Sequence, residues 1–235
     1  MTVAKKIVEE ISRRNYPPGT KLPTEREMLE QYGVGRGTLR ESLRFLEMNG
    51  VVTMKPGPGG GPIVGEPDSR DLAGTLGLFL QLHDTSFRSI VEVRLLLEPI
   101  IAGLAAEKAP QEMLDRIGES VQAMDDGLGD EERFLEANEE FHELVAWASG
   151  NAVFALLICS LHWITDGSPL GVDYPEARRK AVLRAHREVY EALAARDSAK
   201  ASVTMARHLD EFRRYVEQYY PAVYSSPLRW GDISP

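Results

Sequence analysis

A stretch rich in glycine and proline, residues 55–67, constrains the fold of this 235-residue chain more than any other feature. It reads Lys-Pro-Gly-Pro-Gly-Gly-Gly-Pro-Ile-Val-Gly-Glu-Pro, and a helix does not tolerate so many residues of these two types. Two structured regions must therefore meet near this stretch. We predict a first domain over residues 1–65, a linker over 66–71, an all-α domain over 72–220 and a loosely ordered tail over 221–235.

The charge of the chain is divided in the same way. The whole chain has a net charge of −9, which by itself disfavours nucleic-acid binding. Residues 1–65, however, hold 10 Lys or Arg and 7 Asp or Glu, a net charge of +3. Residues 66–235 hold 17 and 29 of these residues, a net charge of −12. This asymmetry indicates that the two regions have different roles.

The residues before the break predict three short helices followed by two strands. The second helix begins with a capping box formed by Thr24 and Glu27, and Gly33 ends it. The third helix is expected over residues 36–48, and the strands over residues 51–54 and 62–64. Two helices joined by a tight turn and followed by a β-hairpin predict a winged helix-turn-helix.

The third helix is the one that a helix-turn-helix motif places in the major groove of DNA. Arg36 and Arg40 lie four positions apart and therefore share one face of this helix. Arginine is the side chain best shaped for a bidentate contact to guanine, so these residues favour base recognition over the alternative of solvated surface charge. The predicted DNA-binding residues are Arg26, Arg36, Thr38, Arg40, Lys55 and Gly57.

The region after the break is periodic and helical. We expect helices over residues 71–82, 86–108, 110–124, 131–148, 151–165, 175–195 and 198–219. Because no strand pattern competes, the sequence predicts a mainly α protein whose second domain is an all-α bundle of about seven helices.

Two histidines lie at matching positions on the last two of these helices. The helices meet at Asp197, with His186 11 residues before it and His208 11 residues after it. In an antiparallel hairpin both lie about 16 Å from the turn, so a shared site is geometrically possible. His142 and Asn138 share one face of an earlier helix. Three imidazoles and an amide oxygen suit Zn²⁺, Ni²⁺ or Mn²⁺ and leave positions open for an anionic ligand.

Two further residues are predicted to contact an effector. Counted from Gly150, His162 is displaced from His142 by about one helical turn, so it fits a cavity wall better than a ligand position. Arg94 can hold an effector carboxylate, or it can form an ion pair with Glu98. The sequence favours neither alternative for Arg94.

Several segments resemble a known family. Residues 18–27 (PGTKLPTERE), 33–43 (GVGRGTLRESL) and 46–52 (LEMNGVV) resemble the DNA-binding domain of GntR-family bacterial regulators. Residues 93–99 and 140–144 resemble the effector domain of the FadR subfamily, called FCD. The resemblance implies DNA contacts at Arg26, Arg36, Arg40 and Gly57, and metal ligands at Asn138, His142, His186 and His208.

The chain departs from the family pattern at three positions. Family members usually have Ser or Thr where Gly35 stands, and often at Gly37, which implies weaker anchoring to the DNA backbone. FCD domains have Asp where Asn138 stands. The loss of this negative charge implies weaker metal binding and a stronger preference for a carboxylate effector.

Together these patterns predict a repressor that binds an inverted repeat in double-stranded DNA as a homodimer and responds to a small organic acid. A metal-dependent enzyme acting on small carboxylates and a ligand-independent DNA-binding protein are the alternatives. The zincin motif HExxH that would favour an enzyme fails, because Ala146 replaces its second histidine. We expect no membrane contact and a cytoplasmic protein, since no apolar stretch reaches the roughly 18 residues of a membrane span.

Overall fold

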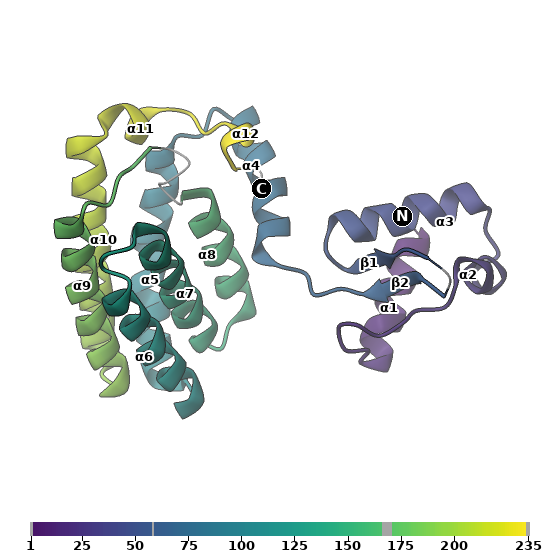
Figure 1. Cartoon of the computed structure of the whole chain (residues 1–235), viewed down its shortest axis with the longest axis horizontal. Coiled ribbons are helices and arrows are strands. Elements are labelled where there is room, and N and C mark those ends of the chain that lie inside the picture. Colours follow the sequence, from purple (N-terminus) through teal and green to yellow (C-terminus); the bar gives the residue numbers. More distant parts are fainter. Residues whose placement is uncertain (1, 58, 166–170, 234–235) are drawn as a thin grey trace. The chain divides into compact units, whose positions relative to one another are not determined.

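The computed structural model describes residues 2–57, 59–165 and 171–233 (Figure 1). The chain divides into two compact units, Met1–Leu72 and Ala73–Pro235. The described part is mainly helical and contains one two-stranded antiparallel sheet, which confirms the predicted fold class. Within these ranges, none of the helices combines the length and the apolar character that a membrane span requires.

The first unit is a winged helix-turn-helix. Its elements are α1 (Thr2–Arg14), α2 (Glu25–Tyr32), α3 (Arg36–Met48), β1 (Val52–Lys55) and β2 (Gly61–Val64). The two strands pair with Val52 opposite Val64 and Lys55 opposite Gly61, and this hairpin is the wing. This is the order of elements that the sequence predicts.

Local interactions determine where the helices of this unit begin and end. The capping box at the start of α2 is complete, because the Thr24 amide donates to the Glu27 carboxylate over 2.7 Å and the Thr24 hydroxyl accepts from the Glu27 amide. Gly33 ends α2 with a φ of 63°, in the left-handed region that glycine adopts without strain,. Leu39 and Leu46 of α3 are buried, which leaves the opposite face of α3 toward solvent.

The second unit is a helical bundle. Its helices are α4 (Ser69–Leu82, beginning in the last residues of the first unit), α5 (Phe87–Lys108), α6 (Gln111–Asp126), α7 (Glu131–Ala148), α8 (Ala152–Thr165), α9 (Glu176–Ala194), α10 (Ser198–Tyr219), α11 (Pro221–Ser225) and α12 (Trp230–Ile233). Because α4 begins at Ser69, the connection between the last strand and this helix is shorter than the linker expected over residues 66–71.

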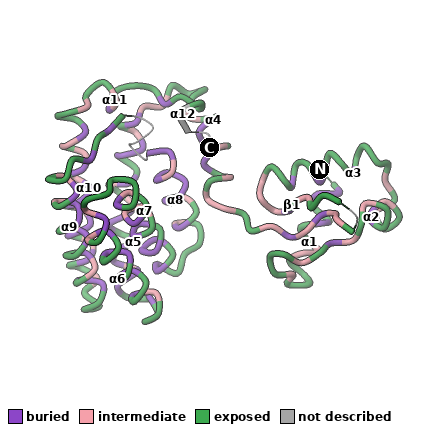
Figure 2. Tube along the Cα trace, viewed as in Figure 1, coloured by how far each residue is buried: buried purple, intermediate pink, exposed green. Residues whose placement is uncertain are grey.

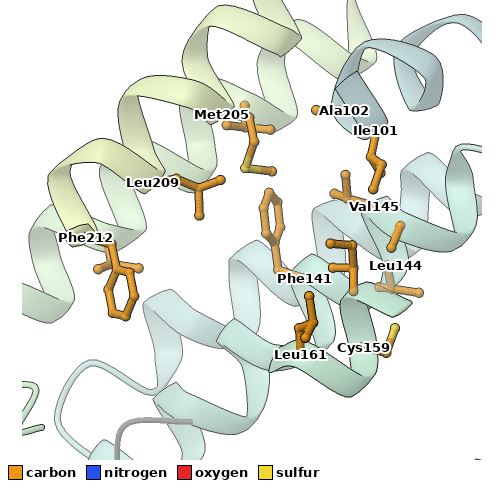
Figure 3. Close-up of a cluster of buried hydrophobic side chains, with 14 of the residues drawn as sticks. Ile101, Ala102, Phe141, Leu144, Val145, Cys159, Leu161, Met205, Leu209 and Phe212 are labelled. Atoms are coloured by element: carbon orange, nitrogen blue, oxygen red, sulfur yellow. The ribbon is translucent and has the colours of Figure 1, made fainter. Parts of the chain in front are cut away.

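Helix α5 forms the centre of the bundle. It packs against α7, α8, α9 and α10, and its buried positions contribute to one continuous apolar core (Figure 2). Phe141 of α7 is fully buried in this core, and Figure 3 shows it close to Met205 and Leu209 of α10. The helices that carry the predicted histidines are therefore held together by apolar contacts around them.

The tail that we expected to be loosely ordered packs onto the bundle. Helix α11 follows α10 directly, and the side chains of Tyr224 and Leu228 are buried. The Leu228 amide also donates a hydrogen bond of 2.9 Å to the Thr85 carbonyl. The expectation for residues 221–235 was therefore wrong for the described part of this segment. The segment is too short and too rich in Ser and Pro for a periodic pattern to reveal this burial.

Candidate functional site

Three buried histidines converge in the second unit. His142 lies on α7, His186 on α9 and His208 on α10, and none is more than 5% exposed. The Nε2 atoms of His186 and His208 are 3.0 Å apart, and those of His208 and His142 are 3.4 Å apart. The structure thus brings together the three histidines that the sequence singles out.

The local structure explains this convergence. Asp197 is the N-cap of α10, where its carboxylate accepts a hydrogen bond of 2.9 Å from the Lys200 amide, and α9 packs against α10 across this turn. His186 and His208 therefore face each other at the same level, as their equal spacing from Asp197 predicts. The ring of Phe141 stacks on that of His186 with centroids 4.0 Å apart, which holds the imidazole in place.

The contacts on the far side of two rings indicate where their protons lie. Nδ1 of His142 is 2.7 Å from Oε2 of Glu98. An ionised carboxylate only accepts, so this contact places a proton on Nδ1 and leaves Nε2 of His142 with a lone pair. Nδ1 of His186 is 3.3 Å from the sulfur of Met124, which favours the same tautomer for His186. The lone pairs of both rings then face Nε2 of His208.

Burial keeps the imidazoles of His186 and His208 neutral. It lowers the pKa of His186 and of His208 well below the ordinary value, and the neighbouring imidazole of His142 acts in the same direction on both. Neutral imidazole is the form that binds a metal ion.

The three histidines fit a divalent metal ion. One ring nitrogen from each lies within 4.8 Å of the other two. A single N–H on His208 can donate to only one of the two lone pairs that face it. A metal cation, by contrast, accepts a lone pair from a ring nitrogen of each of the three histidines. Asn138, four positions before His142, lines the same cavity as His142 and His208. Nitrogen-rich sites of this kind suit zinc, nickel and similar ions.

A second buried network adjoins the histidines. Arg94 and Glu98 on α5 form an ion pair of 2.6 Å, which is one of the two alternatives that the sequence leaves open for Arg94. Arg94 also donates to the Thr165 hydroxyl over 3.1 Å and contacts Nε2 of His162. Glu98 thereby joins Arg94 to His142. Sequence reasoning missed the contact between Glu98 and His142, because no pattern shows which helix faces α5.

Glu98 is ionised in this network. Burial raises its pKa, but the charge of Arg94 and the contacts with His142 outweigh burial and hold the pKa of Glu98 well below its ordinary value. Glu98, His142 and His162 also lie close enough to form a metal site. The guanidinium of Arg94 within this group disfavours a cation there, so the site formed by the three histidines fits a metal better.

A small cavity opens beside the histidines. Its volume is about 30 Å³, enough for roughly two water molecules,. The polar residues that line it include Arg94, Asn138, His142, His162, Arg178 and His208. His162 thus lies in the cavity wall, as its displacement by one helical turn predicts. Arg178 of α9 is a lining residue that sequence reasoning missed, since it was indistinguishable from the other charged residues of that helix.

The predicted DNA-binding side chains of the first unit are exposed. On α2 and α3, Arg26 is paired with Glu30 over 3.6 Å and Arg40 with Glu25 over 3.2 Å, and the two arginine side chains are 88% and 70% exposed. Ion pairs this exposed are weak, so both arginines can exchange their partners for DNA at low cost. Arg36 is also exposed, one turn before Arg40.

The remaining predicted DNA contacts lie at the start of α3 and on the wing. Thr38 is exposed in the first turn of α3, and Gly35 caps this helix without a side-chain hydrogen bond. Lys55 ends β1, and Gly57 follows it with a φ of 95°. Both wing residues are exposed. Exposed basic residues and open amides at a helix N-terminus are suited to bind phosphates.

A winged helix-turn-helix joined to a helical domain with a buried polar site defines a class, the transcription regulators that carry a DNA-binding head and a second domain. The comparisons with known proteins agree with this class. Residues 1–60 match the model of bacterial regulatory proteins of the gntR family, and residues 89–211 match that of the FCD domain. The chain therefore belongs to the GntR family, and it is a DNA-binding transcription regulator rather than an enzyme.

Individual relatives support this assignment. The HTH-type transcriptional regulator YcbG of Bacillus subtilis is 32% identical over 212 residues, which cover 88% of this chain and 87% of YcbG. The HTH-type transcriptional repressor NanR of Cronobacter sakazakii is 28% identical over 217 residues, covering 88% and 81%. A solved structure of a GntR protein of Streptococcus agalactiae has a TM-score of 0.69 at 26% identity and covers 91% of this chain and 98% of that chain.

Proposed function

We propose that this protein is a repressor whose affinity for its operator is controlled by a small organic acid, bound at a metal-containing cavity of the helical unit. The convergence of His142, His186 and His208 beside a polar cavity carries this proposal. Asn138 would complete the metal site, and Arg94 and His162 would contact the acid. A metal would supply a positive charge that attracts a carboxylate, while the side chains orient the acid.

The same observation weighs against the ligand-independent alternative. A DNA-binding protein without an effector would have a filled, apolar core in its second domain. Here several polar side chains and a cavity interrupt the core, although apolar side chains would fill it without the cost of removing polar groups from water. The polar interior therefore supports a sensory role.

We further propose that the protein acts as a homodimer on an inverted repeat. Several large apolar side chains of the second unit are exposed, including Leu96, which is 71% exposed, and Ile100, which is 55% exposed. Leu96, Ile100 and Val93 recur at helical spacing on one face of α5. Exposed apolar faces of this kind support contact with a second copy of the chain, and the two-fold symmetry of a dimer matches an inverted repeat.

The central test measures operator binding by fluorescence anisotropy in the presence of zinc, of a chelator and of a panel of small carboxylic acids. We expect at least one acid to weaken operator binding about 5- to 150-fold in a zinc-dependent manner. Operator affinity that is unchanged by every acid, with and without chelator, would favour the ligand-independent alternative.

Replacing Arg40 by alanine should weaken operator binding. If Arg40 makes a bidentate contact to guanine, the loss is about 1–3 kcal/mol and the preference for that base is relaxed. Titration of operator variants that differ at single base pairs measures both effects. Arg13→Ala, which removes an exposed arginine of α1, is the matched control. An equal loss of affinity for both variants would mean that Arg40 contributes only its positive charge and no specific contact to a base.

Replacing Asn138 by aspartate should strengthen metal binding. The change restores a negative charge beside the imidazoles, so we expect zinc affinity to rise at least about tenfold. Asn138→Ala should lower zinc affinity, because it removes an oxygen ligand. Competition with a fluorescent chelator measures both variants. Tight stoichiometric zinc binding that is unaffected by Asn138→Ala would contradict the role of this amide.

A further inference from the structure

Arg178 on α9 is a partly buried cation with an unsatisfied hydrogen-bond donor. Its Nε is shielded from solvent and has no hydrogen-bond partner, and within the described ranges it is the one buried side-chain nitrogen or oxygen of this kind. The guanidinium lies over the ring of Tyr215, with Cζ 4.5 Å from the ring centroid. No carboxylate of the described residues forms an ion pair with it. Buried polar groups are normally paired, so this exception requires an explanation.

The position of Arg178 provides one, because it lines the same cavity as His142 and His208. Burial lowers its pKa, although the charge of Glu211 acts in the opposite direction. A guanidinium nevertheless stays protonated in proteins, so Arg178 places a positive charge in the cavity wall, to which the acidic residue Glu139 also contributes,. An anion in this cavity would neutralise that charge and would accept hydrogen bonds from the part of the guanidinium that lines it.

Arg94, the other arginine of the cavity wall, does not have this property. Its Nε donates to Glu98, its Nη1 donates to Thr165 and its Nη2 contacts His162. The charge of Arg94 is therefore balanced by that of Glu98, and each of its three nitrogens already has a partner. Arg94 can shape the cavity, but the uncompensated charge within it comes from Arg178.

We propose that Arg178 binds the carboxylate of the effector and sets the preference of the cavity for an acid over a neutral molecule. This inference rests on the proposed function, since it names the residue that recognises the anionic group at the same site. A guanidinium fits a carboxylate with two parallel hydrogen bonds, which a lysine or an amide cannot reproduce. The cavity of about 30 Å³ requires the acid to be small.

The test uses the full-length protein loaded with one equivalent of zinc. Formate and acetate are titrated by calorimetry, and their neutral counterparts formamide and acetamide serve as ligand controls. We expect the wild-type protein to bind the acids and not the amides. Arg178→Gln should weaken binding of the acids about 10- to 100-fold, while zinc affinity stays within about twofold of the wild type.

Two further variants make the result specific. Arg184→Gln removes an exposed arginine from the same helix, and it should bind the acids as the wild type does. Arg178→Lys keeps the charge but loses the paired geometry, so its affinity should lie between those of the wild type and Arg178→Gln. This conservative variant also keeps the test informative if the glutamine variant folds poorly.

The outcomes separate this inference from the proposed function. If Arg178→Gln binds the acids as tightly as the wild type, the inference is overturned and the effector site stands. If the wild type binds zinc but neither acid, both the inference and the acid effector are overturned, while the metal site stands. Acid binding that needs Arg178 in zinc-free protein supports the inference and removes the metal from the proposed function.

Discussion

Replacing Glu98 by glutamine is expected to lower the free energy of unfolding by about 3–5 kcal/mol. The change leaves the buried guanidinium of Arg94 without its carboxylate, and the single amide oxygen can no longer accept from both Arg94 Nε and His142 Nδ1,. Breaking a buried pair is costly because the remaining charge has been taken out of water and cannot recover its hydration. Denaturant unfolding of the metal-free protein measures the loss without any contribution from metal binding.

The same helix provides a matched control. Arg88 and Glu92 form a pair of 2.7 Å with the same residue types and the same spacing as Arg94 and Glu98, but their side chains are 61% and 51% exposed rather than 6% and 3%. Glu92→Gln should therefore cost less than about 1 kcal/mol. Equal losses for Glu92→Gln and Glu98→Gln would show that the buried pair contributes no more to the free energy of unfolding than the exposed pair does.

Replacing His208 by alanine is expected to abolish stoichiometric metal binding. His208 lies between the other two histidines, with its Nε2 3.0 Å from that of His186 and 3.4 Å from that of His142. Removing a hydrogen-bond partner of a metal ligand can weaken metal binding about 100-fold, so removing the ligand itself should weaken it by more. Zinc binds the folded protein, so the rise in Tm that zinc produces in the wild type should disappear in the variant.

Two comparisons complete this experiment. His83 is exposed, and His83→Ala should retain both zinc binding and the zinc-dependent rise in Tm. Operator affinity of folded His208→Ala should remain close to that of the wild type without zinc. If His208→Ala instead loses DNA binding while it keeps its fold, the metal belongs to the DNA-binding switch. Retained stoichiometric zinc binding would remove His208 from the ligand set.

Local chemistry made most of the fold predictable. Thr24, Gly33 and Asp197 begin or end helices through their own hydrogen bonds and backbone preferences, and these effects act within a few residues. The pairing of His186 with His208 was predictable for the same reason, because two helices joined by a short turn can hardly pack in any other register.

Contacts between distant helices were not predictable. Periodicity shows which face of a helix is buried but not which helix covers it, so the contact of Glu98 with His142, 44 positions away, left no trace in the sequence. Arg178 was hidden in the same way among the charged residues of α9. The burial of Tyr224 and Leu228 also depends on a partner helix that the sequence does not name.

The start of α3 has a consequence for how the head meets its operator. Gly35 has a φ of −76°, and a Cβ at Gly35 or Gly37 would meet no atom within 4 Å, so neither the backbone conformation nor a close neighbour demands glycine there. The first turn lacks a side-chain cap, and two glycines give it extra freedom before binding. A phosphate group of the duplex would accept hydrogen bonds from the free amides of this turn, in place of the side-chain cap that the sequence lacks.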